Sequence, residues 1–303
     1  MKVINSKIVC CYLLPITKYG YPPHAEETIK YIEEMHSLGF SSIELEGIRE
    51  THLNTVFEMR EEIKNKFEEL NIAMPYFCSV LPGLSALDDK ERNKNLELFE
   101  KGCKIASYLG AKGILDNGPL PPFQFPSKIP VVRHYGEDSM RLAFLPDNFS
   151  WKKFWDQLVD TYKTICEIAS NYKLEYQVHP AVGVLASSTD GFLLLADSVK
   201  KDNLKFNFDT ANLFAIKENL PLAYLKVKDY VNYIHISDNR GQKVEHLKIG
   251  NGLIDWDKFF DVINKTKYEG YFGIDIGGEE SGVKKLNLAY LSASNFIEEK
   301  WQI

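Results

Sequence analysis

The chain has 303 residues, of which 45% are hydrophobic and 26% charged, a balance typical of a folded globular protein and not of a disordered one. Its 36 lysines and arginines against 42 acidic residues give a net charge of −6, the wrong sign for binding a phosphate backbone, so we expect no nucleic acid partner. No apolar run approaches the ~20 residues of a membrane span, and no membrane partner is expected.

The five cysteines are widely scattered and contain no CxxC pair. An odd, scattered set is typical of reduced thiols, which predicts a cytoplasmic protein and argues against a thiolate zinc site. We interpret them as small core residues.

Short β-branched or aromatic runs alternate with amphipathic runs along the whole chain. The expected strands are residues 7–13, 41–46, 72–79, 111–116, 173–179, 204–209, 231–237 and 271–276. The expected helices are residues 24–38, 53–70, 88–109, 151–171, 190–200, 212–229, 256–266 and 284–300. Strict alternation implies parallel strands, and eight such units predict a single (β/α)₈ TIM barrel, of α/β class, over residues 1–303.

One segment, residues 117–149, is rich in proline and has no clear period. It is too long for a simple connection between a strand and a helix. We expect an irregular loop that covers the mouth of the barrel.

Polar side chains alternate with apolar ones in several of the expected strands, so the polar set should point into the barrel. Gln177, Asp209, His235 and Asp275 lie near the ends of strands five to eight. One imidazole, two carboxylates and an amide oxygen suit Mn²⁺, Mg²⁺, Co²⁺ or Zn²⁺, so we predict one divalent metal. A hydrogen-bonded polar plug without metal would show the same alternation.

The segments FNFDTANLF, YIHISDNRG, HLKIGNGLIDW and GYFGIDIGG resemble the xylose-isomerase-like TIM-barrel superfamily of sugar isomerases, epimerases and related lyases. The resemblance implies one divalent cation held by Glu, Asp, His and Glu from four successive strand ends. Asp209 and His235 match the family's Asp and His, whereas Gln177 and Asp275 stand where glutamates are expected.

These two departures affect the chemistry, because the family's epimerases use both glutamates as acid and base. An amide cannot accept a proton, which leaves Asp275 as the carboxylate that is both ligand and base. The resemblance then implies an isomerase or epimerase that acts on a small keto-sugar or polyol-derived substrate through an enediolate. A lyase or dehydratase of the inosose, keto-glycoside or dehydroshikimate type remains an alternative, as does a non-catalytic sugar-binding barrel.

The remaining candidates lie on the same faces or in the loops that follow the strands. We assign catalysis to Asp275 and His179, and predict that a carbohydrate substrate contacts Glu44, Asn212, Asp238, Arg240 and His246. Abasic-site endonucleases resemble this barrel too, but they carry more histidines and the net charge of −6 disfavours them. The end helices leave room for a homo-oligomer.

Overall fold

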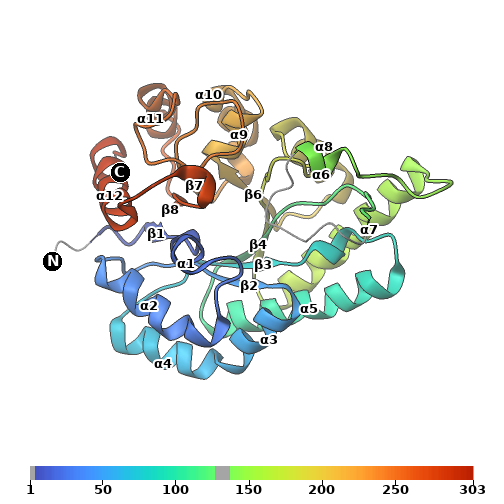
Figure 1. The fold of residues 1–303 in the computed structure, drawn as a ribbon, viewed down its shortest axis with the longest axis horizontal. Helices are drawn as coiled ribbons and strands as arrows, with labels where there is room; N and C mark the ends of the chain where they lie inside the picture. Colours follow the sequence, from blue (N-terminus) through green and yellow to red (C-terminus); the bar gives the residue numbers. More distant parts are fainter. Residues whose placement is uncertain (1–3, 127–136, 303) are drawn as a thin grey trace.

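Eight parallel strands form the centre of the molecule in the computed structural model, which describes residues 4–126 and 137–302 (Figure 1). The strands are β1 (Ile8–Cys10), β2 (Leu45–Ile48), β3 (Tyr76–Val80), β4 (Gly113–Asp116), β5 (Glu175–Val178), β6 (Leu204–Asp209), β7 (Tyr233–Ile236) and β8 (Tyr271–Ile274). Their order is β1-β8-β7-β6-β5-β4-β3-β2. Cys10 joins the two ends, since its N–H donates to Ser42 O (3.0 Å) and its carbonyl accepts from Glu44 N (2.9 Å). The predicted TIM barrel is confirmed.

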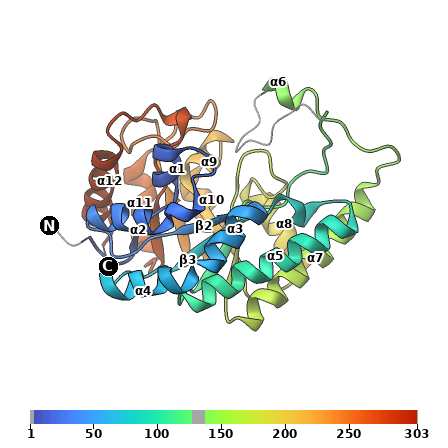
Figure 2. The same cartoon turned by 60° about the horizontal axis from the view of Figure 1, so that its bottom comes forward.

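The helices surround the strands on the outside (Figures 1 and 2). They are α1 (Leu13–Tyr19), α2 (Thr28–Ser37), α3 (Arg49–Glu58), α4 (Arg60–Leu70), α5 (Asp89–Tyr108), α6 (Glu137–Met140), α7 (Trp151–Asn171), α8 (Thr189–Val199), α9 (Thr210–Ala215), α10 (Leu220–Val227), α11 (Trp256–Lys265) and α12 (Leu286–Lys300). Short 3₁₀ turns occur at Ala25–Glu27, Pro82–Ser85, Lys228–Tyr230 and Glu279–Ser281. None of the helices in the described part of the chain has the length and apolar character needed to cross a bilayer.

Besides the single-turn helix α6 inside the expected loop, three helical regions differ from the prediction. The run expected at 53–70 is two helices, because Met59 ends α3 and the chain turns there into α4. The run expected at 212–229 is also divided: Lys217 takes a positive φ of 72°, and Asn219 then caps α10 by accepting from Leu222 N at 3.1 Å. Helix α1, whose buried face includes Leu13 and Leu14, was not expected.

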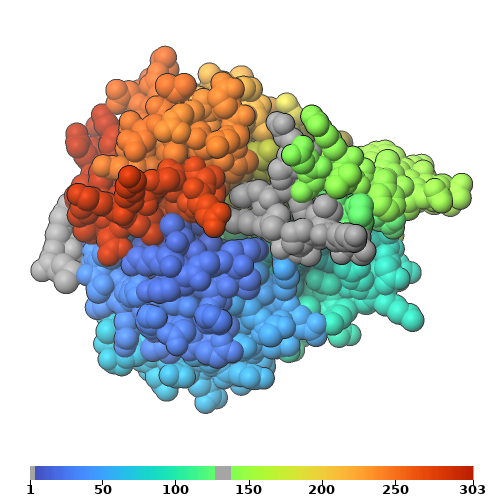
Figure 3. Space-filling view, in the orientation of Figure 1, coloured from blue at the N-terminus to red at the C-terminus, as the bar shows by residue number. Residues whose placement is uncertain are grey.

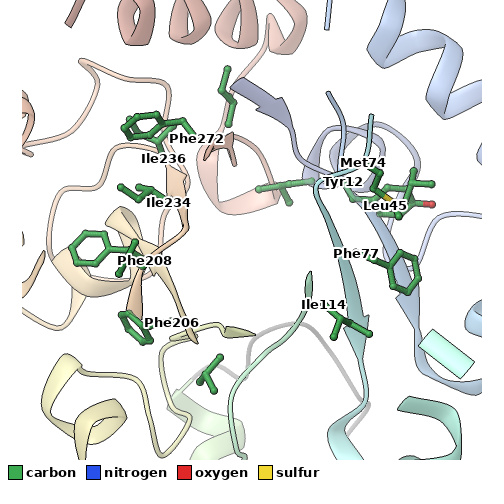
Figure 4. Close-up of a cluster of buried hydrophobic side chains, with 14 of the residues drawn as sticks. Tyr12, Leu45, Met74, Phe77, Ile114, Phe206, Phe208, Ile234, Ile236 and Phe272 are labelled. Carbon is green, nitrogen blue, oxygen red and sulfur yellow. The ribbon is translucent and has the colours of Figure 1, made fainter. Parts of the chain in front are cut away.

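The side chains of the strands divide between an outer and an inner core. Phe206, Phe208, Ile234 and Ile236 point from β6 and β7 toward the helices (Figure 4). The interior is filled by a separate cluster made of Val9, Cys11, Tyr76, Cys78, Leu115 and Tyr233. Within it the ring of Tyr76 stacks on that of Tyr233, with centroids 4.6 Å apart. This packed layer separates the two mouths of the barrel, because a filled interior leaves no open channel between them.

The predicted loop at 117–149 is described only in part, because residues 127–136 lie outside the described residues. Its two described ends are joined, since Gln124 and Phe144 exchange backbone hydrogen bonds of 2.8 and 2.9 Å. Helix α6 stands apart from the ring of helices, and the segment after it lies at the surface (Figures 2 and 3). That the segment covers the barrel mouth stays a prediction.

Candidate active site

Titratable side chains gather at the C-terminal ends of β5 to β8. Asp209 is the last residue of β6, His235 lies within β7, and His179 and Asp275 directly follow β5 and β8. The ends of parallel strands meet at one mouth of a barrel, which brings these residues together. Three overlapping groups have all their candidate ligand atoms within 4.8 Å of one another: Cys11, His235 and Asp275; His179, Asp209 and His235; Asp209, His246 and Asp275.

His235 lies at the centre of this cluster. Its Nε2 donates to Glu44 Oε2 at 3.1 Å, while its Nδ1 lies 3.9 Å from both Asp209 Oδ2 and Asp275 Oδ2. Burial lowers the pKa of His235, but the charge and hydrogen bond of Glu44 and the charges of the two aspartates outweigh burial and raise the pKa to about 9. Nδ1 itself is buried without a hydrogen bond.

Asp209 uses its two oxygens for different tasks. Oδ1 caps α9 by accepting from Asn212 N at 2.7 Å, which fixes the side chain at the turn from strand to helix. Oδ2 lies 3.2 Å from His179 Nε2. Burial opposes ionisation of Asp209, but the hydrogen bond and charge of His179 outweigh it and lower its pKa, so this carboxylate is charged at neutral pH.

His246 enters the cluster from the loop after β7. Its Nδ1 lies 3.0 Å from Glu280 Oε1, so Nδ1 donates, because a carboxylate oxygen only accepts. The other nitrogen, Nε2, lies 3.6 Å from Asp275 Oδ2 and 3.4 Å from Asn212 Nδ2. Asn212 in turn accepts from Val182 N at 3.1 Å through Oδ1.

The donor set fits a divalent cation. In both His235 and His246 one ring nitrogen donates to a glutamate and the other faces the aspartates, an arrangement that orients metal-binding imidazoles in proteins. The orphaned Nδ1 of His235 gives the clearest sign, because a buried nitrogen facing two carboxylates needs either a proton or a cation. The residues that could hold it are Asp209, His235, Asp275, His246 and His179.

Gln177 lies lower in the barrel than the rest of the cluster. In the ladder between β5 and β6 it is opposite Lys205, four residues before Asp209. Its side chain is fully buried and lies beside the Tyr76 hydroxyl, yet neither Oε1 nor Nε2 makes a hydrogen bond of ordinary length. His179, two residues farther along, reaches Asp209 instead. Ligation by Gln177 stays a prediction.

Asp238 and Arg240, which were expected to contact substrate, make hydrogen bonds and ion pairs within the protein. The Asp238 carboxylate accepts from Gly250 N at 2.8 Å and from Trp256 Nε1 at 3.2 Å, so it holds the loop after β7 together. Arg240 donates to Glu245 Oε1 at 2.7 Å, and 54% of its side chain is exposed. Glu44, also expected to bind substrate, holds His235. That Glu44, Asp238 and Arg240 contact a substrate stays a prediction.

Two members of the cluster were not expected from the sequence. Cys11 contributes its sulfur to the group with His235 and Asp275, and the inward alternation of Val9 and Cys11 in the first strand carried that signal. Glu280 lies in the short 3₁₀ turn Glu279–Ser281 after β8, where no periodicity marks it.

Comparison with known proteins shows which family and which solved structures this chain is similar to. The sequence model of the xylose isomerase-like TIM barrel matches residues 32–299. Inosose dehydratase of Bacillus cereus (strain AH820) is 23% identical over 294 residues, which cover 91% of each chain. The 3-keto-D-glucoside 4-epimerase of E. coli has a TM-score of 0.70 at 16% identity, covering 97% of this chain and 100% of that one. D-allulose 3-epimerase of Methylomonas sp. has a TM-score of 0.72 at 15% identity, covering 99% and 100%.

Proposed function

The chain belongs to the xylose isomerase-like TIM-barrel family, and from this premise we propose that it is a divalent-metal-dependent isomerase or epimerase of a small keto-sugar or polyol-derived ketone. The reaction removes a proton from the carbon next to the carbonyl and returns it through an enediolate. The observation that carries the proposal is the orphaned Nδ1 of His235 between two carboxylates, because a cation bound there would lie beside a carboxylate base.

Asp275 is the base in this proposal. It lies at the barrel mouth, directly after β8, and its Oδ2 contacts both His235 and His246. In this proposal Asp209, His235 and His179 would hold the cation, and His246, whose Nδ1 donates to Glu280, holds a proton on Nε2 for return to the substrate. A bound divalent cation would polarise the carbonyl and stabilise the negative charge that develops on its oxygen.

The donor atoms also favour some cations over others. Imidazole nitrogens suit Zn²⁺, Co²⁺ and Mn²⁺, whereas Mg²⁺ prefers oxygen ligands and retains water. His235 and His246 both present a ring nitrogen to the aspartates. Of the four expected cations, Mg²⁺ therefore has the least support.

Dehydration is the second candidate, because one specific contact favours it. His246 Nε2 and Asp275 Oδ2 lie 3.6 Å apart, so a base and a proton donor can act on the same face of a substrate. Loss of water next to a carbonyl needs both: the base takes the α-proton and the donor protonates the departing hydroxyl. The inosose dehydratase that covers 91% of this chain points to the same reaction class.

A solvent-exchange experiment tests the shared first step and separates the two outcomes. The protein is incubated in D₂O with Mn²⁺ and a panel of ketohexoses and inososes, and the products are followed by NMR and mass spectrometry. Deuterium next to the carbonyl without loss of water indicates isomerisation or epimerisation, and loss of water indicates a dehydratase. We expect Asp275→Asn to abolish exchange and Asp257→Asn, an exposed aspartate on α11, to leave it unchanged. Protein that binds no divalent cation and exchanges no substrate would refute the proposal.

A further inference from the structure

A cavity opens at the mouth of the barrel opposite the candidate active site. Its volume is about 800 Å³, within the range of small-molecule sites. Its lining comes from residues that precede or begin strands, such as Tyr76 at the start of β3 and Tyr271 at the start of β8. The interior layer of Tyr76, Tyr233 and their neighbours separates it from the candidate active site. It is therefore a separate place in the fold.

The charge of this cavity is opposite to that of the chain. Five lysines and three acidic residues line it, a surplus of two positive charges in a protein whose net charge is −6. The lysines are Lys7, Lys112, Lys173, Lys228 and Lys267. Clustered like charges repel one another, so the arrangement is stabilised by any anion that lies among them.

Only some of these ammonium groups have a partner. Lys228 pairs with Asp229 at 2.9 Å, and Lys7 donates to the carbonyl of Glu269 at 2.6 Å. For Lys112, Lys173 and Lys267, no ion pair with another described residue is present. The ammonium groups of Lys7 and Lys112 both lie near the ring of Tyr271, at 4.8 and 5.2 Å from its centroid. Three of the five ammonium groups in the lining therefore have no acidic partner among the described residues.

The inner end of the cavity has a different chemistry. Glu175 is half-buried there; its Oε1 accepts from Asn232 Nδ2 at 2.7 Å, and its Oε2 lies 3.5 Å from the Tyr76 hydroxyl. A carboxylate oxygen has a further lone pair, which can accept a hydroxyl group of a ligand. The cavity thus combines a hydroxyl acceptor inside with ammonium groups outside.

We propose that this cavity binds a small hydroxylated phosphate ester of the sugar phosphate class. A phosphate monoester carries close to two negative charges at neutral pH, which matches the surplus of the lining, and its three oxygens can each accept from an ammonium group. The sugar hydroxyls donate to Glu175, and the ring of Tyr271 contacts an apolar face of the sugar.

Calorimetric titration of the intact protein with glucose 6-phosphate, inorganic phosphate and glucose tests this. We expect glucose 6-phosphate to bind more tightly than either part. The double variant Lys112→Glu/Lys173→Glu should weaken it by about tenfold or more. The control Lys152→Glu/Lys163→Glu, on the exposed surface of α7, changes the net charge equally and should bind like wild type. Glu175→Gln should weaken glucose 6-phosphate but not inorganic phosphate.

Three results would overturn the proposal. Equal weakening by both double variants would show unspecific attraction to the whole protein. Loss of binding in Asp275→Asn would place the ligand in the candidate active site, whereas the proposal expects that variant to bind normally. A wild-type dimer that the Lys112→Glu/Lys173→Glu variant dissociates in sedimentation would make this mouth an interface between copies. Failure of the catalytic proposal leaves the expected titrations unchanged.

Discussion

Asp116 provides a test of the electrostatics of this barrel. It ends β4, is 4% exposed, and accepts from Asn117 N at 2.7 Å and from Leu81 N at 3.4 Å. Burial raises the pKa of this carboxyl from 3.8 to about 7, because the two N–H groups compensate only part of the lost hydration. Asp116→Asn removes the charge, keeps the shape, and keeps an oxygen that can accept the same hydrogen bonds.

The shift determines how stability depends on pH. The unfolded chain releases this proton near pH 3.8 and the folded chain near pH 7, so between these values the folded state binds more protons and stability falls as pH rises. A difference of about three pKa units corresponds to roughly 4 kcal/mol. We therefore expect Asp116→Asn to be more stable than wild type by roughly 4 kcal/mol at about pH 8, and by only about 1 kcal/mol at about pH 4.5.

Urea unfolding of both proteins at the two pH values measures this difference. Asp156→Asn is a matched control, since Asp156 lies on the surface of α7 with 58% of its side chain exposed. Its curve should follow that of wild type at both pH values within about 0.5 kcal/mol. A gain for Asp116→Asn that is the same at both pH values would refute the reasoning, because the gain would then come from packing and not from the charge.

Three further changes have expected outcomes. Glu44→Gln weakens Mn²⁺ binding by about 10–100-fold in calorimetry because it removes the charge behind His235, whereas Glu175→Gln at the opposite mouth does not. Gln177→Glu tightens metal retention in dialysis by adding a negative charge; unchanged retention would place this side chain out of reach of the cation. Burial lowers the pKa of His52 from 6.5 to about 4, so the free energy of unfolding of wild type falls as pH drops between these values. The His52→Phe variant has no such group, so its loss of unfolding free energy over this pH range, measured in urea, should be smaller than that of wild type by roughly 3 kcal/mol.

The fold was predictable because the relevant signals are local. Helix α7 occupies the predicted range, Trp151–Asn171, with Ser150 as its cap, since the apolar period and the cap lie within the segment itself. The division between α3 and α4 was not predictable, because residues on both sides of Met59 keep the same period while the chain turns. Helix α1 was missed because its apolar residues continue the run of the first strand.

The alternation of polar and apolar residues along the strands predicted the site residues near strand ends, but not the contacts made by residues in loops. Asp209, His235 and Asp275 follow from inward positions near strand ends, and the structure brings them together. The roles of Asp238 and Arg240 depend on how a loop folds back: the same loop that gives Asp238 the Trp256 indole as a partner also presents His246 to Asp275. Such contacts between loops leave no periodic pattern in the sequence.

The distribution of carboxylates explains how this barrel can dispense with two glutamates at the expected ligand positions. Glu44 and Glu280 remain in the site, but each is hydrogen-bonded to a histidine and lies behind it as seen from Asp275. Negative charge is thereby kept near the cluster, and once a cation replaces the proton on His235, neutral imidazole nitrogens would face its centre. Neutral ligands neutralise less of a cation's charge than carboxylates do, so a cation held here would withdraw electrons from a carbonyl more strongly. Stronger electron withdrawal would make the proton next to the carbonyl more acidic. A site with a single carboxylate base would benefit most, because a more acidic proton compensates for the missing second carboxylate.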